Sequence, residues 1–347
     1  MSRKIFITGV GGFIASHIHD ELVQRDHLVY GCDDESGGWL GNCQKVNSLG
    51  GFLWPFSCES AEIREELIEG NYDTLVHCAA NAREGASQFQ PYIVTQRNLN
   101  AYMGVLSAAI QGGIRNVVLY SSMAAYGAQK PPFKESLRLE PNDVYAWNKT
   151  AMEGCTEILS KVHGFNYVII RPHNVFGERQ CLHDRFRNAV AIFMNLVMRG
   201  EPITIYGDGL QTRAFSYIYD SLPSFVRCVE ETEKLHRQCI NIGGIKPITV
   251  LDLARTVVAA MGEDPYAYPI EFLKDRPQDV KHAHSTFKKS QDLLGYHETV
   301  GWEAGVYRMA EWAKENGPQD WENNDPIEII TDKLPEPWKL LVKQEVG

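Results

Sequence analysis

The chain has 347 residues, of which 44% are hydrophobic and 22% charged, so length and composition favour a soluble globular protein with one large domain and a smaller lobe. Its formal net charge of −10 and its lack of a basic run argue against a nucleic acid partner. No apolar stretch approaches the roughly 20 residues that span a bilayer, and no secretory signal follows Met1, so we expect a cytoplasmic protein with no membrane partner.

The first half of the chain alternates short apolar runs with helical patterns. Continuous apolar runs between helices are typical of strands in a parallel sheet that is covered on both faces. The patterns predict strands at 5–8, 28–32, 74–78, 117–120 and 167–170, and helices at 12–25, 63–68, 98–111 and 145–162. We therefore expect an α/β fold with a Rossmann-type, doubly wound parallel sheet.

This alternation ends near residue 177. The later patterns predict a helix at 185–199, a strand at 202–206, a strand and a helix within 215–230, the end of a strand at 241–243 and a helix at 251–261. The polar, proline-bearing segment 317–335 is expected to be peripheral surface structure. We expect a nucleotide-binding domain of residues 1–177 plus about 215–244, and a smaller, discontinuous α+β substrate lobe of about 178–214 plus 245–347.

A glycine-rich loop stands between the first predicted strand and helix. It runs from Thr8 to Ser16 as T-G-V-G-G-F-I-A-S, and a dinucleotide-binding loop requires this position. Gly9 allows a tight turn, and Gly12 lets the backbone approach a pyrophosphate at the helix N-terminus. Asp33 ends the second strand, where a carboxylate binds a ribose 2′-hydroxyl and repels a 2′-phosphate. The loop and Asp33 therefore favour NAD over NADP as cofactor.

Three residues have the chemistry of a proton shuttle between an alcohol and a ketone. Tyr145 and Lys149 are four positions apart and share one face of a helix. A lysine cation favours the phenolate and lowers a tyrosine pKa from its ordinary value of about 10. Ser122 follows an apolar strand, at the sheet edge where ligands bind, and its hydroxyl could hold the same substrate oxygen. Each pattern alone is also typical of a turn or a helix surface, but their order after a dinucleotide loop favours catalysis.

The cysteines and histidines predict no metal site. The eight cysteines include no C-x-x-C pair, and the eleven histidines include no H-x-x-x-H pair. Small buried thiols account for most of the cysteines.

Taken together, these motifs resemble those of an extended short-chain dehydrogenase/reductase of the NAD-dependent nucleotide-sugar epimerase/dehydratase family, and most closely UDP-galactose 4-epimerase-type enzymes. The resemblance runs nearly end to end. Besides the glycine loop, it includes V-H-C-A-A at 76–80, Ser122 four residues before Y-G at 126–127, Y-A-W-N-K at 145–149, R-P-H-N-V-F-G at 171–177, Y-G-D-G-L-Q-T-R at 206–213 and R-P-Q-D-V at 276–280. Two departures are Cys58-Glu59, where the family has Asp followed by Ile or Leu, and Ala214, where Asp or Ser is common.

The resemblance implies a role for individual residues. Ser122, Tyr145 and Lys149 match the catalytic Ser/Thr, the base and its activator. The positions that match cofactor contacts are Gly9, Gly11, Gly12, Phe13, Ile14, Asp33, Cys58, Glu59, Cys78, Ala79, Ala80, Asn98, Ser121, Tyr145, Lys149 and Pro172. The positions expected to bind a nucleotide-diphosphate sugar are Arg83, Ser122, Tyr145, Asn174, Arg179, Arg187, Arg213 and Arg276.

The arginines in this set divide into two groups. Arg213 and Arg276 match arginines that bind the diphosphate, whose oxygens suit the guanidinium fork. Arg179, Arg185 and Arg187 lie in the loop expected beside the nucleotide and could also pair with a carboxylate on the sugar. Arg83 could likewise face the sugar.

The reaction implied by the resemblance is inversion of one hydroxyl of a nucleotide-diphosphate sugar, at C4, through a transient ketone and with tightly bound NAD. Related 4,6-dehydratases carry Asp-Glu directly after the catalytic Thr, where this chain has Met123 and Ala124. Sugar-acid decarboxylases carry Glu, and a 3,5-epimerase carries Cys, at the position of Ala124. Neither Met nor Ala transfers a proton, so simple ketone formation and return is the reaction that remains.

Other functions stay open from sequence. A nucleotide-sugar 4-keto reductase or a dehydratase would use the same core, although Asp33 argues against the NADPH that a reductase normally needs. A non-catalytic NAD-binding sensor would have no need of the intact Ser122, Tyr145 and Lys149. The family often forms homodimers through two helices, on which Met103, Leu106, Ala151 and Ile158 could form the interface or be buried within one subunit.

Overall fold

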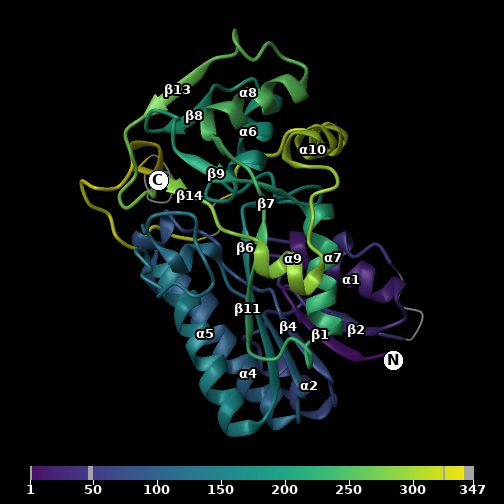
Figure 1. Ribbon diagram of the computed structural model, residues 1–347. Coiled ribbons are helices and arrows are strands. Elements are labelled where there is room, and N and C mark those ends of the chain that lie inside the picture. Colours follow the sequence, from purple (N-terminus) through teal and green to yellow (C-terminus); the bar gives the residue numbers. More distant parts are fainter. Residues whose placement is uncertain (1, 46–49, 323–324, 340–347) are drawn as a thin grey trace.

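The computed structural model describes residues 2–45, 50–322 and 325–339. A seven-stranded sheet with the order β11-β6-β5-β4-β1-β2-β3 forms its larger part (Figure 1). Every neighbouring pair in this sheet is parallel, which confirms the Rossmann-type fold. The strands are β1 (Lys4–Thr8), β2 (Leu28–Cys32), β3 (Leu53–Trp54), β4 (Thr74–His77), β5 (Asn116–Tyr120), β6 (Asn166–His173) and β11 (Gln238–Gly243).

The strands are apolar along their length because helices cover both faces of the sheet. Side chains alternate between the faces of a strand, so Ile5 and Ile7 of β1 pack in one core, while Phe6 between them packs in the other. One face is covered by α1 (Phe13–Gln24) and α7 (Ile218–Glu230). The opposite face is covered by α2 (Ala61–Glu69), α4 (Ala101–Gln111) and α5 (Val144–His163) (Figure 1).

A second group of elements lies at the carboxyl end of the sheet, in the upper part of Figure 1. Helices α6, α8 and α10 pack on one another, β13 pairs with β8, and β9 lies between β12 and β14. The elements are α6 (Ala189–Met198), β8 (Ile203–Tyr206), β9 (Thr212–Ala214), β12 (Pro247–Thr249), α8 (Val250–Met261), β13 (Ile270–Leu273), β14 (His282–Ala283) and α10 (Trp302–Asn316).

Three further elements join these two groups. The short parallel pair β7 (Val175–Phe176) and β10 (Ser216–Tyr217) stands where the chain leaves the sheet and returns to it. Helix α9 (Lys288–Leu294) packs on β11 and α7, so part of the segment 245–347 contacts the sheet. The division into two domains at the positions given above stays a prediction. Within the described ranges no helix is long and apolar enough to cross a membrane, and a cytoplasmic location also stays a prediction.

Two predicted segments differ from the structure in ways that matter for the pocket. The helix predicted at 185–199 begins only at Ala189, because the Asn188 side chain caps it by accepting a hydrogen bond from Val190 N at 3.1 Å. Residues 185–188 are therefore free to line a pocket. The helix predicted at 98–111 starts earlier, with α3 (Pro91–Thr95) and a π-helical turn at Gln96–Asn100 before α4.

The prediction that 317–335 is peripheral surface structure holds for most of its described residues, but three of them are buried. Asp325 is 1% exposed and binds Arg83 and Arg97 at 2.8 Å each. Leu334 is buried in an apolar cluster whose other members are Ala86, Phe89, Ile327 and Trp338. The sequence does not reveal this burial, because Asp325 and the few apolar side chains of the segment contact partners more than 200 positions earlier in the chain.

A buried ion pair holds α5 against the sheet. The Glu153 carboxylate accepts hydrogen bonds from Arg171 of β6 at 2.9 and 2.6 Å, and from Ser121 Oγ at 2.5 Å. Arg171 also donates to the Tyr126 hydroxyl at 2.7 Å. Because two buried charges satisfy each other only at short range, the pair determines how α5 is rotated and placed relative to β5 and β6.

We expect Glu153→Gln to lower the free energy of unfolding by about 3–5 kcal/mol, since it leaves the Arg171 charge buried without its counterion. Urea denaturation followed by circular dichroism measures the loss. The matched control is Glu157→Gln on the same helix, where the exposed pair with Lys161 at 2.7 Å contributes at most about 1 kcal/mol. Equal losses in the two variants would contradict a special role for the buried pair.

Candidate active site

A pocket of about 550 Å³ opens at the carboxyl ends of the central strands. β1 has β2 on one side and β4 on the other, and the chain leaves β1 and β4 in opposite directions. Such a switch point leaves a crevice in which ligands of α/β proteins bind. The pocket runs from Asp33 at the end of β2, past Ser122 and Tyr145, to Arg213 and Arg276.

Most of the residues predicted from the sequence line this one pocket. They are Gly9, Gly12, Phe13, Ile14, Asp33, Cys58, Glu59, Cys78, Ala79, Ala80, Arg83, Ser121, Ser122, Tyr145, Lys149, Pro172, Asn174, Arg187, Arg213 and Arg276.

Three predicted residues lie outside the pocket wall. The Gly11 carbonyl is covered by a loop and accepts hydrogen bonds from Trp39 N and Asn42 Nδ2. Asn98 is buried behind the wall, where its amide donates to Asn81 O at 3.1 Å and Val94 O at 2.7 Å. Arg179 binds Asp20 of α1 at 2.9 Å. The expected contact between Arg179 and the sugar is therefore corrected, because the Asp20 carboxylate binds the Arg179 guanidinium outside the pocket wall.

The cofactor half of the pocket has the shape that a dinucleotide requires. Gly9 has a φ of 67°, and a Cβ built there would come within 2.7 Å of the Ala79 Cα, so no side chain fits between the loop and the end of β4. Asp33 follows β2 and lines the pocket, with Glu35 N donating to its Oδ1 at 2.7 Å. Burial raises the pKa of Asp33. The glycine loop, which lies close to the end of β4, and the Asp33 carboxylate at the end of β2 both suit NAD as the cofactor.

The reaction end of the pocket contains Tyr145 and Ser122, both buried. Asp143 caps α5 by accepting a hydrogen bond from Ala146 N at 2.8 Å, which places Tyr145 in the first helical turn. Ser122 ends the segment after β5, and its Oγ accepts from Ala124 N at 3.1 Å. Ser122 lies close enough to Tyr145 to lower the pKa of that tyrosine. The two hydroxyl-bearing side chains therefore line the same part of the pocket, as two groups acting on one substrate oxygen must.

The electrostatics of Tyr145 differ from the sequence-based expectation. Burial raises the pKa of Tyr145, and the Glu84 carboxylate raises it further, whereas Ser122 and Arg187 lower it. Lys149 donates from Nζ to Tyr120 O at 2.8 Å, and this Nζ lies 5.8 Å from the Tyr145 ring centroid. Arg187 is thus a cation that lowers the pKa of Tyr145, a role that the sequence did not predict, while the effect of Lys149 on Tyr145 stays a prediction. Burial lowers the pKa of Lys149 itself to about 8.

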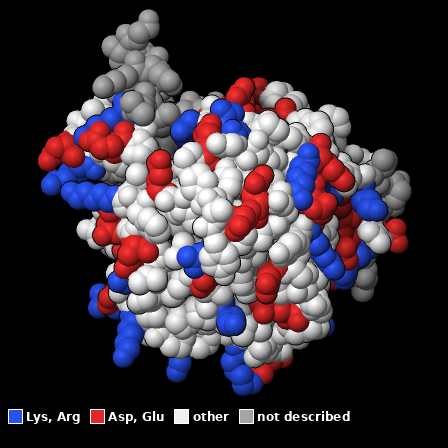
Figure 2. Space-filling model, turned by 90° about the horizontal axis from the view of Figure 1, so that it is seen from above, with Lys and Arg blue, Asp and Glu red and all other residues white. Residues whose placement is uncertain are grey.

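Arg213 and Arg276, the two arginines predicted to bind a diphosphate, also line this pocket. Arg213 and Arg276 share Asp279, at 3.1 and 3.0 Å, and Arg276 lies 4.8 Å from the Tyr206 ring centroid. On the face seen in Figure 2, acidic and basic side chains are interspersed and form no broad basic patch among the residues coloured. An anion would therefore be bound by these local arginines and not by the field of that surface.

Two other arginines of the pocket are already paired, whereas Arg185 lies 4.8 Å from the Trp321 ring centroid and has no salt bridge among the described residues. Arg83 and Arg187 share Asp184, at 3.1 and 3.0 Å, and Arg83 also binds Asp325. Sequence reasoning missed Glu84, Asp184, Asp325 and Trp338, all of which lie in or beside the pocket. Glu84 adjoins a matched motif and could have been found there, but no local pattern joins Arg83 to Asp325, which is 242 positions away.

We expect Lys149→Met to stabilise the nucleotide-free protein at pH 7 while abolishing turnover. A folded-state pKa lowered from 10.5 to about 8 costs about 3 kcal/mol at neutral pH, partly offset by the hydrogen bond to Tyr120 O. The folded state binds fewer protons than the unfolded state between these two pKa values, so the cost fades as the pH rises towards 10.

Denaturation at pH 7 and pH 10 measures this difference, with the exposed Lys161→Met on the same helix as the control. A stability difference that does not change with pH would contradict the buried cation.

Comparison with known proteins places these features in a family. Residues 5–243 match the model of the NAD dependent epimerase/dehydratase family. A UDP-glucuronate 4-epimerase from Thermodesulfobacterium geofontis is 26% identical over 321 residues, which are 89% of this chain and 96% of that protein. A UDP-N-acetyl-alpha-D-glucosaminuronate decarboxylase from Bacillus cytotoxicus is 24% identical, over 91% of this chain and 99% of that protein.

Solved structures share the fold over the same length. The UDP-glucose 4-epimerase of Thermotoga maritima with UDP-glucose has a TM-score of 0.80 and 26% identity, covering 90% of this chain and 99% of that chain. The UDP-glucuronic acid 4-epimerase of Bacillus cereus, in complex with UDP-glucuronic acid and NAD, has a TM-score of 0.81 and 26% identity with the same coverage. The resemblance drawn from the motifs is confirmed, and this chain belongs to the NAD-dependent epimerase/dehydratase family.

Proposed function

We propose that the protein is an NAD-dependent epimerase that inverts one hydroxyl, at C4, of a nucleotide-diphosphate sugar through a transient ketone. The observation that carries this proposal is that Tyr145 and Ser122, which lie close together, line one pocket with Arg213 and Arg276. The two hydroxyl groups suit a sugar hydroxyl, and the two arginines suit a diphosphate. The UDP-sugars named for its relatives support UDP as the nucleotide.

The chain's own residues divide the work of this reaction. Gly9, Gly12, Asp33 and Lys149 would hold NAD, which when bound supplies a reversible two-electron acceptor. Tyr145 Oη takes the proton of the sugar hydroxyl as the ketone forms, and returns a proton as the hydroxyl is restored. Ser122 Oγ hydrogen-bonds the same oxygen in both directions. The ketone carbon is planar, so a sugar that turns over between the two halves of the reaction leaves with the opposite configuration.

The residues after Ser122 favour this reaction over the related ones. Met123 is buried against the Asn174 side chain, with its sulfur 3.5 Å from Nδ2, and Ala124 has no proton to give. Besides the base that removes the proton of the sugar hydroxyl, a dehydratase needs a second acid and base to eliminate water. Neither Met123 nor Ala124 can act as one. A 4-keto reductase would consume NADPH stoichiometrically, and a sensor would need no paired hydroxyls.

Tyr145→Phe tests the proposal directly. We expect the purified protein to retain NAD and to interconvert a UDP-sugar with its C4 epimer without added cofactor, as followed by NMR. The variant should keep the bound NAD but lose turnover by at least about 10²-fold, because the proton acceptor is gone. Retained epimerisation would sink the assignment, and a 4-keto-6-deoxy product would favour the dehydratase.

The protein also has a surface suited to a homodimer, which we include in the proposal. Along α5, Trp147 and Ile158 are 60% and 61% exposed, and the small Ala151 and Gly154 lie between them at helical spacing. Met103 of α4 is partly exposed near the same face, but Leu106 is fully buried and is removed from the predicted interface. An exposed apolar helix face of this kind is typical of a protein–protein interface.

Ile158→Arg should convert the dimer to a monomer, because it places an unpaired charge on the apolar face. Analytical ultracentrifugation measures the change. Tyr307→Arg on α10, also an exposed residue on a helix, is the control and should leave the dimer intact. A wild-type protein that sediments as a monomer would overturn this part of the proposal.

A further inference from the structure

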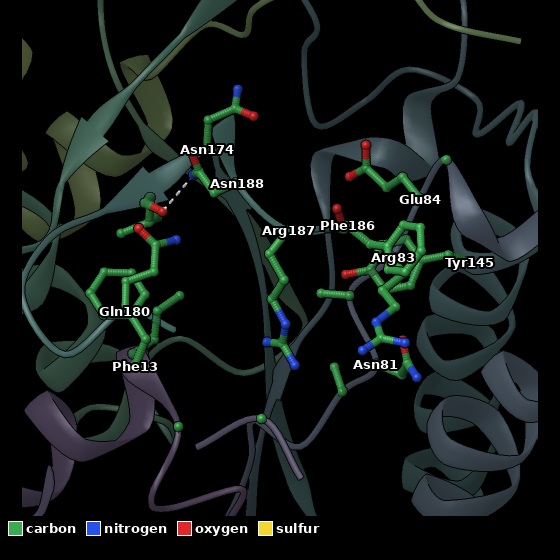
Figure 3. A pocket seen from close by; sticks show the side chains of 18 of the residues that line it. Phe13, Asn81, Arg83, Glu84, Tyr145, Asn174, Gln180, Phe186, Arg187 and Asn188 are labelled. Carbon is green, nitrogen blue, oxygen red and sulfur yellow. Dashed lines mark hydrogen bonds between the residues drawn. The ribbon is translucent and has the colours of Figure 1, made fainter. Parts of the chain in front are cut away.

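Glu84 places a carboxylate at the reaction end of the pocket. It follows Arg83 in the segment after β4, and its side chain is open to the main pocket and to a smaller recess beside it. Its charge is close enough to Tyr145 to raise the pKa of that tyrosine. Figure 3 shows Glu84 and Tyr145 on one side of the pocket, with Arg187 pointing into the space from another element. A sugar held between Tyr145 and the diphosphate arginines would therefore pass Glu84.

The Glu84 carboxylate has no hydrogen bond or salt bridge among the described residues, although six arginines line the pocket. Five of these arginines are bound to other carboxylates, and Arg185 instead lies 4.8 Å from the Trp321 ring centroid. Arg83 and Arg97 bind Asp325, Arg83 and Arg187 bind Asp184, and Arg213 and Arg276 bind Asp279. The pocket carboxylates of Asp33, Asp34 and Glu59 also have no salt bridge among the described residues, but they follow β2 and β3 in the cofactor half, whereas Glu84 lies close to Tyr145. The nearest acidic neighbour, Asp143, adds to this negative charge.

Charges of both signs act on Glu84. Burial raises its pKa, as do Asp143 and Asp279, whereas Arg213 and Arg276 lower it. Both arginines are bound to Asp279, so Glu84 itself remains without a salt bridge among the described residues. The Nε of Arg187 is bound to Asp184, and a Cβ built on Gly37, in the cofactor half of the pocket, would collide with its guanidinium. The Arg187 guanidinium is thus directed towards the cofactor half.

We propose that Glu84 is a specificity-determining residue that selects nucleotide sugars whose C5 substituent is uncharged over the corresponding uronic acids. A carboxylate accepts hydrogen bonds from sugar hydroxyls and repels a second carboxylate. This inference rests on the proposed epimerisation, in which the sugar ring turns over within the pocket. If the ring turns over between the two halves of the reaction, each of its edges faces Glu84 in turn, so a C5 carboxylate is penalised in one orientation or the other.

Binding to the Tyr145→Phe protein with its NAD tests the selectivity without turnover. Protein walls around Glu84, and then Asp143, raise its pKa to about 7, so the measurement is made at pH 8, where the carboxylate is ionised. We expect calorimetry to show UDP-glucose binding on the order of 10- to 100-fold more tightly than UDP-glucuronate, because two like charges within one pocket repel each other. Adding Glu84→Gln should remove most of that ratio by strengthening UDP-glucuronate binding.

Glu62→Gln, an exposed substitution on α2, is the matched control and should leave the ratio unchanged. Because Glu84 has no partner to lose, Glu84→Gln should unfold at the wild-type temperature or slightly above it. Equal or tighter binding of UDP-glucuronate by the parent, or a ratio unaffected by Glu84→Gln, overturns the inference. Failure of the proposed function shows separately, as loss of UDP-glucose epimerisation by the protein with Tyr145 intact.

Discussion

The buried pair of Glu153 and Arg171 is the interaction on which the geometry of this pocket depends. Tyr145, Lys149 and Glu153 are spaced by four on α5, so they point from one face of the helix towards the sheet. Arg171 of β6 fixes the last of the three, and Ser121 at the end of β5 joins the same carboxylate. This pair fixes the helix to the strand two turns away from Tyr145, and so determines how Tyr145 is placed relative to Ser122. The spacing in the sequence puts the three side chains on one face of α5, and the ion pair holds that face against the sheet.

Charge within the pocket is arranged by a second set of carboxylates. Asp279 holds Arg213 and Arg276 at the end suited to a diphosphate, and Asp184 holds Arg83 and Arg187 nearer the reacting hydroxyls. Such pairing reduces the net charge of the arginines while orienting their donors. It also leaves Glu84, which lies close to Tyr145, without a hydrogen bond or salt bridge among the described residues. Selectivity towards an anionic sugar therefore depends less on how many arginines line the pocket than on which of them remain unpaired.

Much of the fold followed from local pattern. The strand–loop–helix start, the Asp33 position and the spacing of Tyr145 and Lys149 are encoded within short segments, and backbone geometry converts such spacing directly into placement. The short strands β3, β7, β9 and β14 could not be predicted, because two or three residues carry no periodicity. The burial of Asp325 and Leu334, in the largely exposed segment after α10, was missed because these two residues become core residues only through partners that are distant in the sequence.

The sequence by itself determined the parallel sheet, the NAD-dependent family and the residues proposed to carry the proton, since each depends on contacts within a few turns or on a motif of fixed spacing. The tertiary structure decided which charges act on those residues. It brought Arg187 close enough to lower the pKa of Tyr145, removed Arg179 from the pocket wall and added Glu84 to it. Electrostatic energies depend on distance and burial, which residues far apart in sequence acquire only when the chain folds.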